Sequence, residues 1–219
     1  DGARPGPMGE GDPEPPTEPA PAGPVMEKEP NGARTNASVL PINGGLRGSL
    51  SQPDKADPLD EDWYVLTLPG PGSQQVRVQL SPEDGSDYTL VWKTAQSRAV
   101  EAPKTRKRRR KKPSNPEDLA TIDRGKAGEV EVFPPTILKP GRHYFQVRLA
   151  RSKKAQPYAP ERGYRLTTIV IDPEPGMEHE PNDTREEAGG IRPGETRQGY
   201  LGWYGDGDWY EVDLSGVPE

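Results

Sequence analysis

Oxygen-bearing side chains gather at four places in the sequence. Glu27-Lys-Glu-Pro-Asn31 and Glu178-His-Glu-Pro-Asn182 are acidic segments that end in asparagine, and Asp60-Glu-Asp62 and Asp206-Gly-Asp208 are acidic pairs that precede Trp-Tyr. Carboxylate and amide oxygens are the ligands that calcium prefers, six to eight at a time. The same residue types also form turns, since Asn and Asp side chains hydrogen-bond to their own backbone. A calcium site and a set of solvated turns are therefore both consistent with the sequence.

Each acidic pair leads into two adjacent aromatic residues, Trp63-Tyr64 and Trp209-Tyr210. Neighbours in a strand point to opposite faces, so one ring is expected to fill a core while the other covers an edge. The alternative is a stacking platform for a ligand, because tyrosine and tryptophan are favoured at binding surfaces. The candidates for a ligand-binding face are Trp92, Tyr88, Tyr144 and Tyr158.

A dense basic run interrupts this pattern within a predicted insert at about 94–126. Its charged members are Lys104, Arg106, Lys107, Arg108, Arg109, Arg110, Lys111 and Lys112. Like charges at this density repel one another, which predicts a solvated loop or a proteolysis site. The alternative is contact with a polyanion such as DNA, an anionic polysaccharide or acidic lipid. Nucleic acid is not the expected partner, because no aromatic residues are interleaved with the basic ones.

Residue combinations that support catalysis are scarce in this sequence. The chain has 2 histidines, His143 and His179, and 0 cysteines. A cysteine nucleophile, a disulfide and a cysteine-based zinc site are therefore excluded. The two histidines are far apart, and no HExxH or Gly-x-Ser-x-Gly motif accompanies them. We expect no enzymatic activity.

The composition limits how much of the chain can form a packed core. Hydrophobic residues make up 30% of the 219 residues, whereas there are 28 prolines and 25 glycines. Residues 1–26 are rich in Pro, Gly and Glu, and such a stretch buries too little surface to offset its ordering entropy. We predict that it is a disordered tether. The chain contains no run of about 18 apolar residues of the kind that spans a bilayer.

From about residue 38 the pattern is one of short strands separated by turns. The clearest strand is Gln75-Val-Arg-Val-Gln-Leu80, where apolar and polar residues alternate, as expected when one face is buried and the other solvated. Further strands are predicted at 46–50, 63–68, 88–92, 129–133, 142–149 and 164–171. This spacing, with no convincing helix, predicts an all-β antiparallel sandwich.

Part of the sequence occurs twice. Glu27 to Asn31 reappear as Glu178 to Asn182, and Asp60 to Tyr64 reappear as Asp206 to Tyr210 after five residues drop out of the second copy. An internal repeat of this kind marks a structural unit that is used more than once. The predicted parts are a first repeat at 27–172, a linker at 173–177 and a second, truncated repeat at 178–219.

These motifs resemble the bacterial pre-peptidase C-terminal domain family, which includes the collagen-binding domains of clostridial collagenases. The resemblance lies in the Glu-x-Glu-Pro-Asn segment, the Gly-x-Leu strand at 48–50 and the Asp-x-Asp-Trp-Tyr run. The stretch at 140–147 and the Tyr-x-Leu strand at 164–166 are also similar to the family. One full copy and one truncated copy are covered, whereas the basic insert has no counterpart.

The resemblance implies a jelly-roll-like β-sandwich of the kind appended to secreted peptidases and other exported proteins. It also implies that the acidic segment and the acidic pair of one copy converge on a single calcium ion. The implied ligands are Glu178, Glu180, Asn182, Asp183, Asp206 and Asp208 in the second repeat, and Glu27, Glu29, Asn31, Asp60 and Asp62 in the first. Gly32 stands where the second repeat has Asp183, so the first site lacks one carboxylate.

We therefore expect a non-catalytic accessory module of a bacterial protein that is secreted, displayed on the cell surface or periplasmic. In one interpretation calcium stabilises the module, which attaches its parent protein to an extracellular polymer or protein surface. In the other, the module is a structural appendage that aids secretion or folding of a neighbouring domain, such as a peptidase, and holds no durable ligand.

Overall fold

The computed structural model describes residues 25–50, 61–83, 85–95, 117–150 and 163–215. Within these ranges the regular secondary structure is almost entirely β-strand, with two short 3-10 helices, η1 (Arg34–Asn36) and η2 (Arg185–Glu187). Neither helix in the described part of the chain is long or apolar enough to cross a membrane. The prediction of an all-β fold is confirmed.

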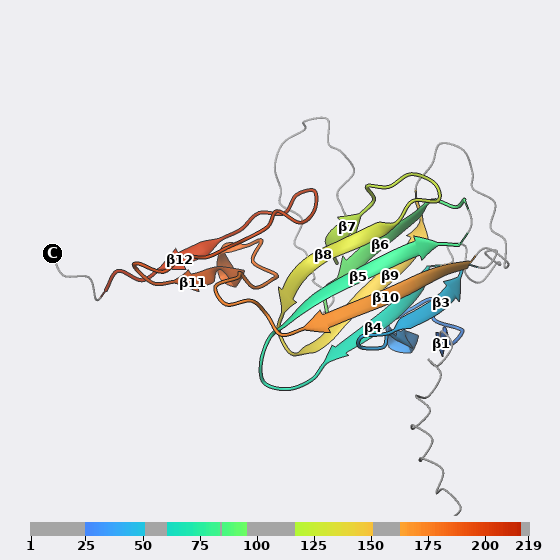
Figure 1. Ribbon diagram of the computed structural model, residues 1–219, viewed down its shortest axis with the longest axis horizontal. Coiled ribbons are helices and arrows are strands. Elements are labelled where there is room, and N and C mark those ends of the chain that lie inside the picture. The colour runs from blue at the N-terminus through green and yellow to red at the C-terminus, as the bar shows by residue number, and fades with distance from the viewer. Residues whose placement is uncertain (1–24, 51–60, 84, 96–116, 151–162, 216–219) are drawn as a thin grey trace, which may run out of the picture.

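Ten of the strands form two five-stranded sheets that stack as the layers of a sandwich (Figure 1). The first sheet contains, in spatial order, β1 (Val25–Met26), β3 (Gly45–Ser49), β10 (Gly163–Ile171), β5 (Gln74–Pro82) and β8 (Glu131–Leu138). The second contains β2 (Ser38–Val39), β4 (Asp62–Leu68), β9 (Gly141–Leu149), β6 (Tyr88–Lys93) and β7 (Asp118–Ile122). The longer strands pair antiparallel, as predicted, whereas the two-residue edge strands β1 and β2 pair in parallel with β3 and β4.

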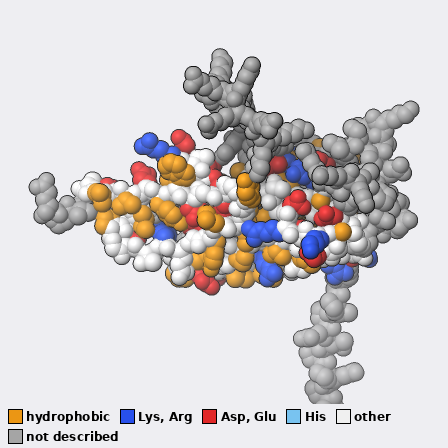
Figure 2. Space-filling view, turned by 90° about the horizontal axis from the view of Figure 1, so that it is seen from above, with side chains coloured by type: hydrophobic (Ala, Val, Ile, Leu, Met, Phe, Trp, Pro, Cys, Tyr) orange, Lys and Arg blue, Asp and Glu red, His pale blue; other side chains and the backbone are white. Residues whose placement is uncertain are grey.

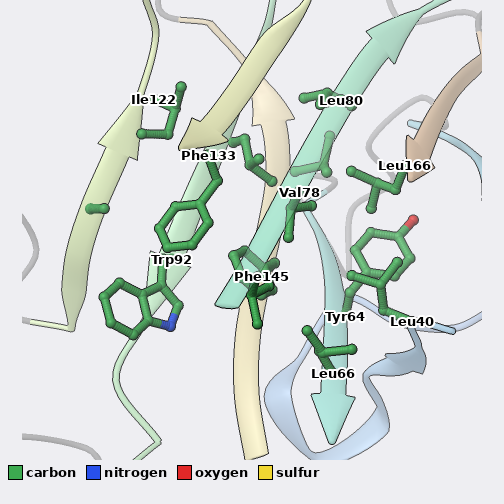
Figure 3. Close-up of a cluster of buried hydrophobic side chains, with 14 of the residues drawn as sticks. Leu40, Tyr64, Leu66, Val78, Leu80, Trp92, Ile122, Phe133, Phe145 and Leu166 are labelled. Atoms are coloured by element: carbon green, nitrogen blue, oxygen red, sulfur yellow. The ribbon is translucent and has the colours of Figure 1, made fainter. Parts of the chain in front are cut away.

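In β5, alternating residues bury one face of the strand. Val76, Val78 and Leu80 are fully buried, as predicted, while Arg77 between them is exposed. Figure 3 shows Val78 and Leu80 among the buried side chains of the core, with Val78 close to Phe145 of β9. Burial of a side chain of this size contributes about 1.5–3 kcal/mol. This core is therefore a major source of the stability of the sandwich.

Two strands lie where the sequence analysis predicted no regular structure. β1 occupies the end of the tether predicted at 1–26, where it pairs with β3. β7 lies inside the insert predicted at about 94–126 and pairs with β6. Its alternate residues Ala120 and Ile122 are buried in the core. The rest of the predicted tether (1–24) and the basic run (104–112) lie outside the described residues.

The second repeat lies beside the end of the sandwich where β8 and β10 finish (Figure 1). It contains β11 (Gly189–Ile191) and β12 (Tyr210–Val212). These strands pair in parallel, with Gly189 opposite Tyr210, and β2 and β4 of the first repeat pair in parallel with Ser38 opposite Tyr64. In the sequence repeat, Gly189 corresponds to Ser38 and Tyr210 to Tyr64. The two copies therefore share this pairing register as well as their motifs.

Candidate metal centres

The first glutamate of the first acidic segment, Glu27, fastens that segment to the sandwich. One of its carboxylate oxygens accepts a hydrogen bond from the Ser49 amide at 2.6 Å. The other accepts hydrogen bonds from the Tyr64 hydroxyl at 2.5 Å and from the Asn31 side-chain amide at 3.0 Å. Hydrogen bonds to a charged acceptor are stronger than those between neutral groups. Because protein donors already engage both oxygens, Glu27 mainly orients the segment.

Glu178 occupies the same position in the second repeat. Its carboxylate accepts hydrogen bonds from the Tyr200 amide at 2.5 Å and from the Tyr210 hydroxyl at 2.6 Å. The Asn182 side-chain amide donates a third hydrogen bond at 3.2 Å. Burial and then the hydrogen bond to Glu178 raise the pKa of the Tyr210 hydroxyl, so it stays protonated and remains a donor. The two glutamates therefore have matching partners.

A glycine stands beside each of these carboxylates. A Cβ atom at Gly48 would lie 2.6 Å from a Glu27 oxygen and 2.6 Å from the Tyr64 hydroxyl oxygen, closer than real Cβ atoms come. A Cβ atom at Gly199 would collide with the Glu178 carboxylate in the same way. The glycine of each Gly-x-Leu motif therefore leaves room for the glutamate.

The asparagine at the end of each acidic segment joins it to the Trp-Tyr strand. The Trp63 amide donates to the Asn31 carbonyl at 2.9 Å, and the Trp209 amide donates to the Asn182 carbonyl at 3.0 Å. Each bond holds the start of the aromatic strand beside the acidic segment. As a result, the aspartate that directly precedes each tryptophan lies next to the glutamates.

The first acidic cluster consists of Glu27, Glu29, Asn31 and Asp62. One carboxylate oxygen from each of its three acids lies within 4.8 Å of the others. The Oδ1 atom of Asn31 is buried and accepts no hydrogen bond within the described structure. Asp60, the remaining predicted ligand of this cluster, lies outside the described residues.

Two buried tyrosines connect the first acidic cluster to the core. The Tyr164 hydroxyl donates a hydrogen bond to the Asp62 carboxylate, and its oxygen lies 2.5 Å from the Tyr64 hydroxyl oxygen. Burial first, and then the nearby negative charges, raise the pKa of both tyrosines well above its ordinary value. Both hydroxyls therefore remain protonated and hold the acidic side chains in place.

The structure brings all six predicted ligands of the second repeat together. This second acidic cluster comprises Glu178, Glu180, Asn182, Asp183, Asp206 and Asp208. Its acids form two overlapping triads, each with oxygen atoms within 4.8 Å of one another: Glu178, Glu180 and Asp208, and Glu180, Asp183 and Asp206. Glu180 belongs to both triads and therefore lies at the centre of the cluster.

Several oxygen atoms of the second acidic cluster have no hydrogen-bond donor. Within the described part of the chain, the buried atoms in question are Glu180 Oε1, Asn182 Oδ1, Asp206 Oδ1 and Asp208 Oδ1. Asn182 is 1% exposed and Glu180 is 4% exposed, so water has little access to them. An unsatisfied buried polar group costs about 1–3 kcal/mol, and a charged group costs more. A cation held among these oxygens would remove that cost.

The pKa values show the same crowding of negative charge. Burial, followed by repulsion from neighbouring carboxylates, raises the pKa of Glu180 from 4.5 to about 8. The same causes raise the pKa values of Asp206 and Asp208 from 3.8 to about 6. The ionised forms are thus disfavoured in the protein alone, and a positive charge within about 4–6 Å would favour them again. The donor set therefore fits a hard divalent cation.

The two clusters differ in their access to solvent. Glu29 in the first cluster is exposed, whereas its counterpart Glu180 is buried. The difference arises because the second acidic segment lies on the first sandwich, where the Glu180 amide donates to the Ile137 carbonyl of β8 at 2.9 Å. Electrostatic interactions are stronger where water is excluded. The second acidic cluster is therefore the better candidate for a metal centre.

The structure does not place the predicted ligand-binding aromatics on an open face. Tyr88 and Trp92 belong to the buried core, because β6 is buried along its whole length. Tyr144 is 8% exposed, and the guanidinium of Arg34 lies 5.5 Å from its ring centroid. The sequence pattern did not reveal that both faces of β6 are covered. Tyr158 and the eight basic residues at 104–112 lie outside the described residues.

Trp203 lies between the two repeats, and no sequence pattern marked it as a functional residue. Its ring packs into the core of the first sandwich, 5.9 Å from the rings of Phe133 and Trp92. Trp203 falls where five residues drop out of the second copy, so it has no counterpart in the first repeat that would have marked it. A lone tryptophan in a turn is the only sequence signal.

Comparisons with known proteins give a likeness among solved structures only. No protein-family model matches this chain, and no curated protein is similar to it in sequence. Among solved structures, the chain is similar to the pre-peptidase C-terminal domain of a collagenase from Bacillus anthracis, with 15% identity and a TM-score of 0.36. The match covers 60% of this chain and 93% of that one. The family membership that the motifs suggest stays a prediction.

Proposed function

We propose that this chain is a non-catalytic accessory module of an exported protein and that calcium, bound at the second acidic cluster, stabilises it. The observation that carries the proposal is the group of four buried oxygens around Glu180 that accept no hydrogen bond from any described residue. Carboxylate and amide oxygens match the ligands that calcium takes, and water can complete its shell. Bound calcium would supply the positive charge that the crowded carboxylates lack.

The arrangement of the donors favours calcium over magnesium. The donors come from two separate segments, 178–183 and 206–208, and include both carboxylate and amide groups. Magnesium requires near-ideal octahedral geometry and keeps several of its waters, whereas calcium accepts six to eight ligands in flexible geometry. Calcium modules that work outside cells have dissociation constants of about 10⁻⁴–10⁻³ M. A site of this kind suits a secreted, surface-exposed or periplasmic protein.

The settings of the two histidines support a non-catalytic role. His143 packs beside Trp92, with ring centroids 6.2 Å apart, and its Nε2 atom lies 2.8 Å from the Lys139 carbonyl oxygen. Burial lowers the pKa of His143, which favours the neutral ring. His179 lies in the second acidic segment with an exposed side chain. His143 thus occupies a packing position, and His179 faces solvent.

Attachment of the parent protein to a polymer or protein surface is the binding role we propose. Figure 2 shows apolar side chains gathered on the part of the surface formed by the second repeat, where Tyr200 and Leu201 are exposed. The rival role is a structural appendage without a durable ligand. The burial of Tyr88, Trp92 and Tyr144 favours that rival, because it removes the candidate binding face. Retention of the full chain on collagen, cell-wall material or heparin separates the two roles.

Titration calorimetry of the full chain tests the calcium proposal. Calcium should bind with a dissociation constant of about 10⁻⁴–10⁻³ M, and magnesium should bind more weakly. Asp208→Asn should weaken calcium binding about tenfold or more. Glu211→Gln is the matched control, because Glu211 is an exposed acid on β12 outside the cluster. Absence of calcium uptake by the wild-type chain would refute the proposal.

A further inference from the structure

Trp203 joins the second repeat to the core of the first. Its indole stacks on Phe133 of β8 with an interplanar angle of 15° and meets Trp92 of β6 edge-on at 75°. Trp203 is 6% exposed and belongs to the same buried cluster as those two residues. Removal of an aromatic side chain from such a position leaves a large cavity. The first sandwich is therefore completed by a side chain of the second repeat.

The equivalent positions of the two repeats show what this contact buries. Met26 precedes the first acidic segment and is 65% exposed, whereas Met177 precedes the second and is 5% exposed. Met177, Ile137 of β8 and Trp203 line the same small cavity. Glu180 is buried at the same place, because its backbone pairs with the backbone of β8. One interface thus covers both an apolar residue and the central acid of the cluster.

The loop that carries Trp203 is held from both sides. Within the second repeat, the Asp206 carboxylate accepts a hydrogen bond from the Gly202 amide, and the Asp206 amide donates to the Trp203 carbonyl at 3.5 Å. From the first repeat, the Arg124 guanidinium donates to the Gly202 carbonyl at 2.7 Å. Asp206 is therefore a candidate metal ligand that also shapes the tryptophan loop.

We infer that cation binding at the second acidic cluster and seating of Trp203 in the first sandwich are coupled, so that the cation locks the two repeats together. This inference rests on the proposed calcium binding. Docking excludes water from Glu180 and confines the negative charges, and a cation offsets the resulting repulsion. Conversely, a seated Trp203 fixes the loop that presents Asp206. Coupling between two such events is reciprocal: docking strengthens cation binding by the same factor by which the cation strengthens docking. A change that abolishes docking must therefore weaken cation binding.

Calcium titration of Trp203→Ala and Tyr204→Ala in the full chain tests the coupling. Tyr204 is the next residue of the same loop but is 88% exposed, so its truncation controls for changes that leave the docking intact. Trp203→Ala should weaken calcium binding at the second cluster about fivefold or more, and Tyr204→Ala should leave it unchanged.

Arg124→Ala provides a second variant that leaves the aromatic core whole. It removes the hydrogen bond to the Gly202 carbonyl and should weaken calcium binding in the same direction as Trp203→Ala. Hydrogen exchange of β8 gives the converse measurement, because β8 contributes no predicted ligand. Calcium should slow exchange at 131–138 in the wild type and in Tyr204→Ala, and not in Trp203→Ala.

The outcomes separate this inference from the proposed function. If the wild-type chain takes up no calcium, both are overturned. The second outcome is that the wild type takes up calcium, that Arg124→Ala and Trp203→Ala bind calcium as tightly as Tyr204→Ala, and that calcium slows hydrogen exchange in β8 equally in all of them. In that case the coupling is overturned and the calcium proposal stands. If Trp203→Ala does not fold, the Arg124→Ala result decides between the same two outcomes.

Discussion

At the scale of single residues, the two glutamates of each acidic segment have different tasks. Glu178 uses both carboxylate oxygens for hydrogen bonds to the Tyr200 amide and the Tyr210 hydroxyl. Glu180 instead has one buried oxygen without a donor and lies among the aspartates. The first glutamate is thus bound to the protein framework, and the second faces the candidate metal position. Substitutions at the two positions should therefore have different effects.

Replacement of Glu180 by glutamine should raise stability in the absence of calcium and reduce the stabilisation that calcium provides. Glutamine keeps the shape of the side chain but removes its charge. In chelator the thermal midpoint should rise, because one source of repulsion is gone. Saturating calcium should raise the thermal midpoint of Glu180→Gln by less than it raises that of the wild type, because a charged ligand is lost. The control Glu211→Gln should alter neither the midpoint in chelator nor the midpoint in calcium. A midpoint in chelator that is lower for Glu180→Gln than for the wild type would contradict this prediction.

The contribution of Glu180 to stability should also depend on pH. Its pKa is about 8 in the folded chain against an ordinary value of 4.5. Between these values the folded state holds a proton that the unfolded state has released, so the free energy of unfolding falls as pH rises. In chelator, the wild type should lose stability relative to Glu180→Gln between pH 4.5 and pH 8. A constant difference between the two midpoints across this window would count against the pKa shift.

At the scale of elements, the Gly-x-Leu strand and the acidic segment form one structural unit. β3 supplies the Ser49 amide that binds Glu27, and Gly48 lets the carboxylate approach the strand. The sequence showed that the motifs recur together, but it did not show that they touch. Their spacing in both repeats follows from this contact.

Replacement of Gly48 by alanine should destabilise the first sandwich. The added Cβ would meet Glu27 and Tyr64 oxygens at 2.6 Å, and overpacking of this kind costs about 1–3 kcal/mol. Gly72→Ala is the matched control, because no atom lies within 4 Å of a Cβ built there. Denaturant unfolding should show a lower midpoint for Gly48→Ala alone. Equal midpoints for the two variants would show that the glycine is not required.

Alternation of apolar and polar residues predicted the long strands well, because one face of each must be buried. Val76, Val78 and Leu80 illustrate this. The pattern did not predict β1 and β7, since β1 has two residues and β7 follows a charged run. It also did not place Trp92, because an aromatic residue in a strand suits a core and a binding face equally. Only the packing of the sheets decides between them.

At the scale of the whole molecule, the second repeat and the first sandwich share a buried junction. Trp203 completes the core of the first sandwich, and Glu180 pairs with β8. These contacts join residues far apart in the sequence, so local patterns gave no sign of them. The sequence was enough to select these acidic residues as candidate ligands, because calcium ligands are restricted to oxygen donors. The sequence did not indicate that these residues are buried at the junction.

Calcium should therefore stabilise the full chain as a unit. A ligand that binds only the folded state adds about 2.7 kcal/mol to the free energy of unfolding at about 100 times its dissociation constant. Because the cluster lies at the junction, this gain should appear in the unfolding of the first sandwich as well. Far-ultraviolet circular dichroism during denaturant unfolding, with calcium and with chelator, measures the difference. Superimposable curves would rule out a stabilising calcium site.

A crystal structure of the chain grown with calcium tests the central claim most directly. We expect a calcium ion bound by carboxylate oxygens of Glu180, Asp206 and Asp208 at about 2.3–2.6 Å, with the Asn182 amide oxygen close by and Trp203 seated against Phe133. This expectation would be contradicted by a cluster that holds no ion at saturating calcium and whose buried oxygens are all hydrogen-bonded to water or to protein donors.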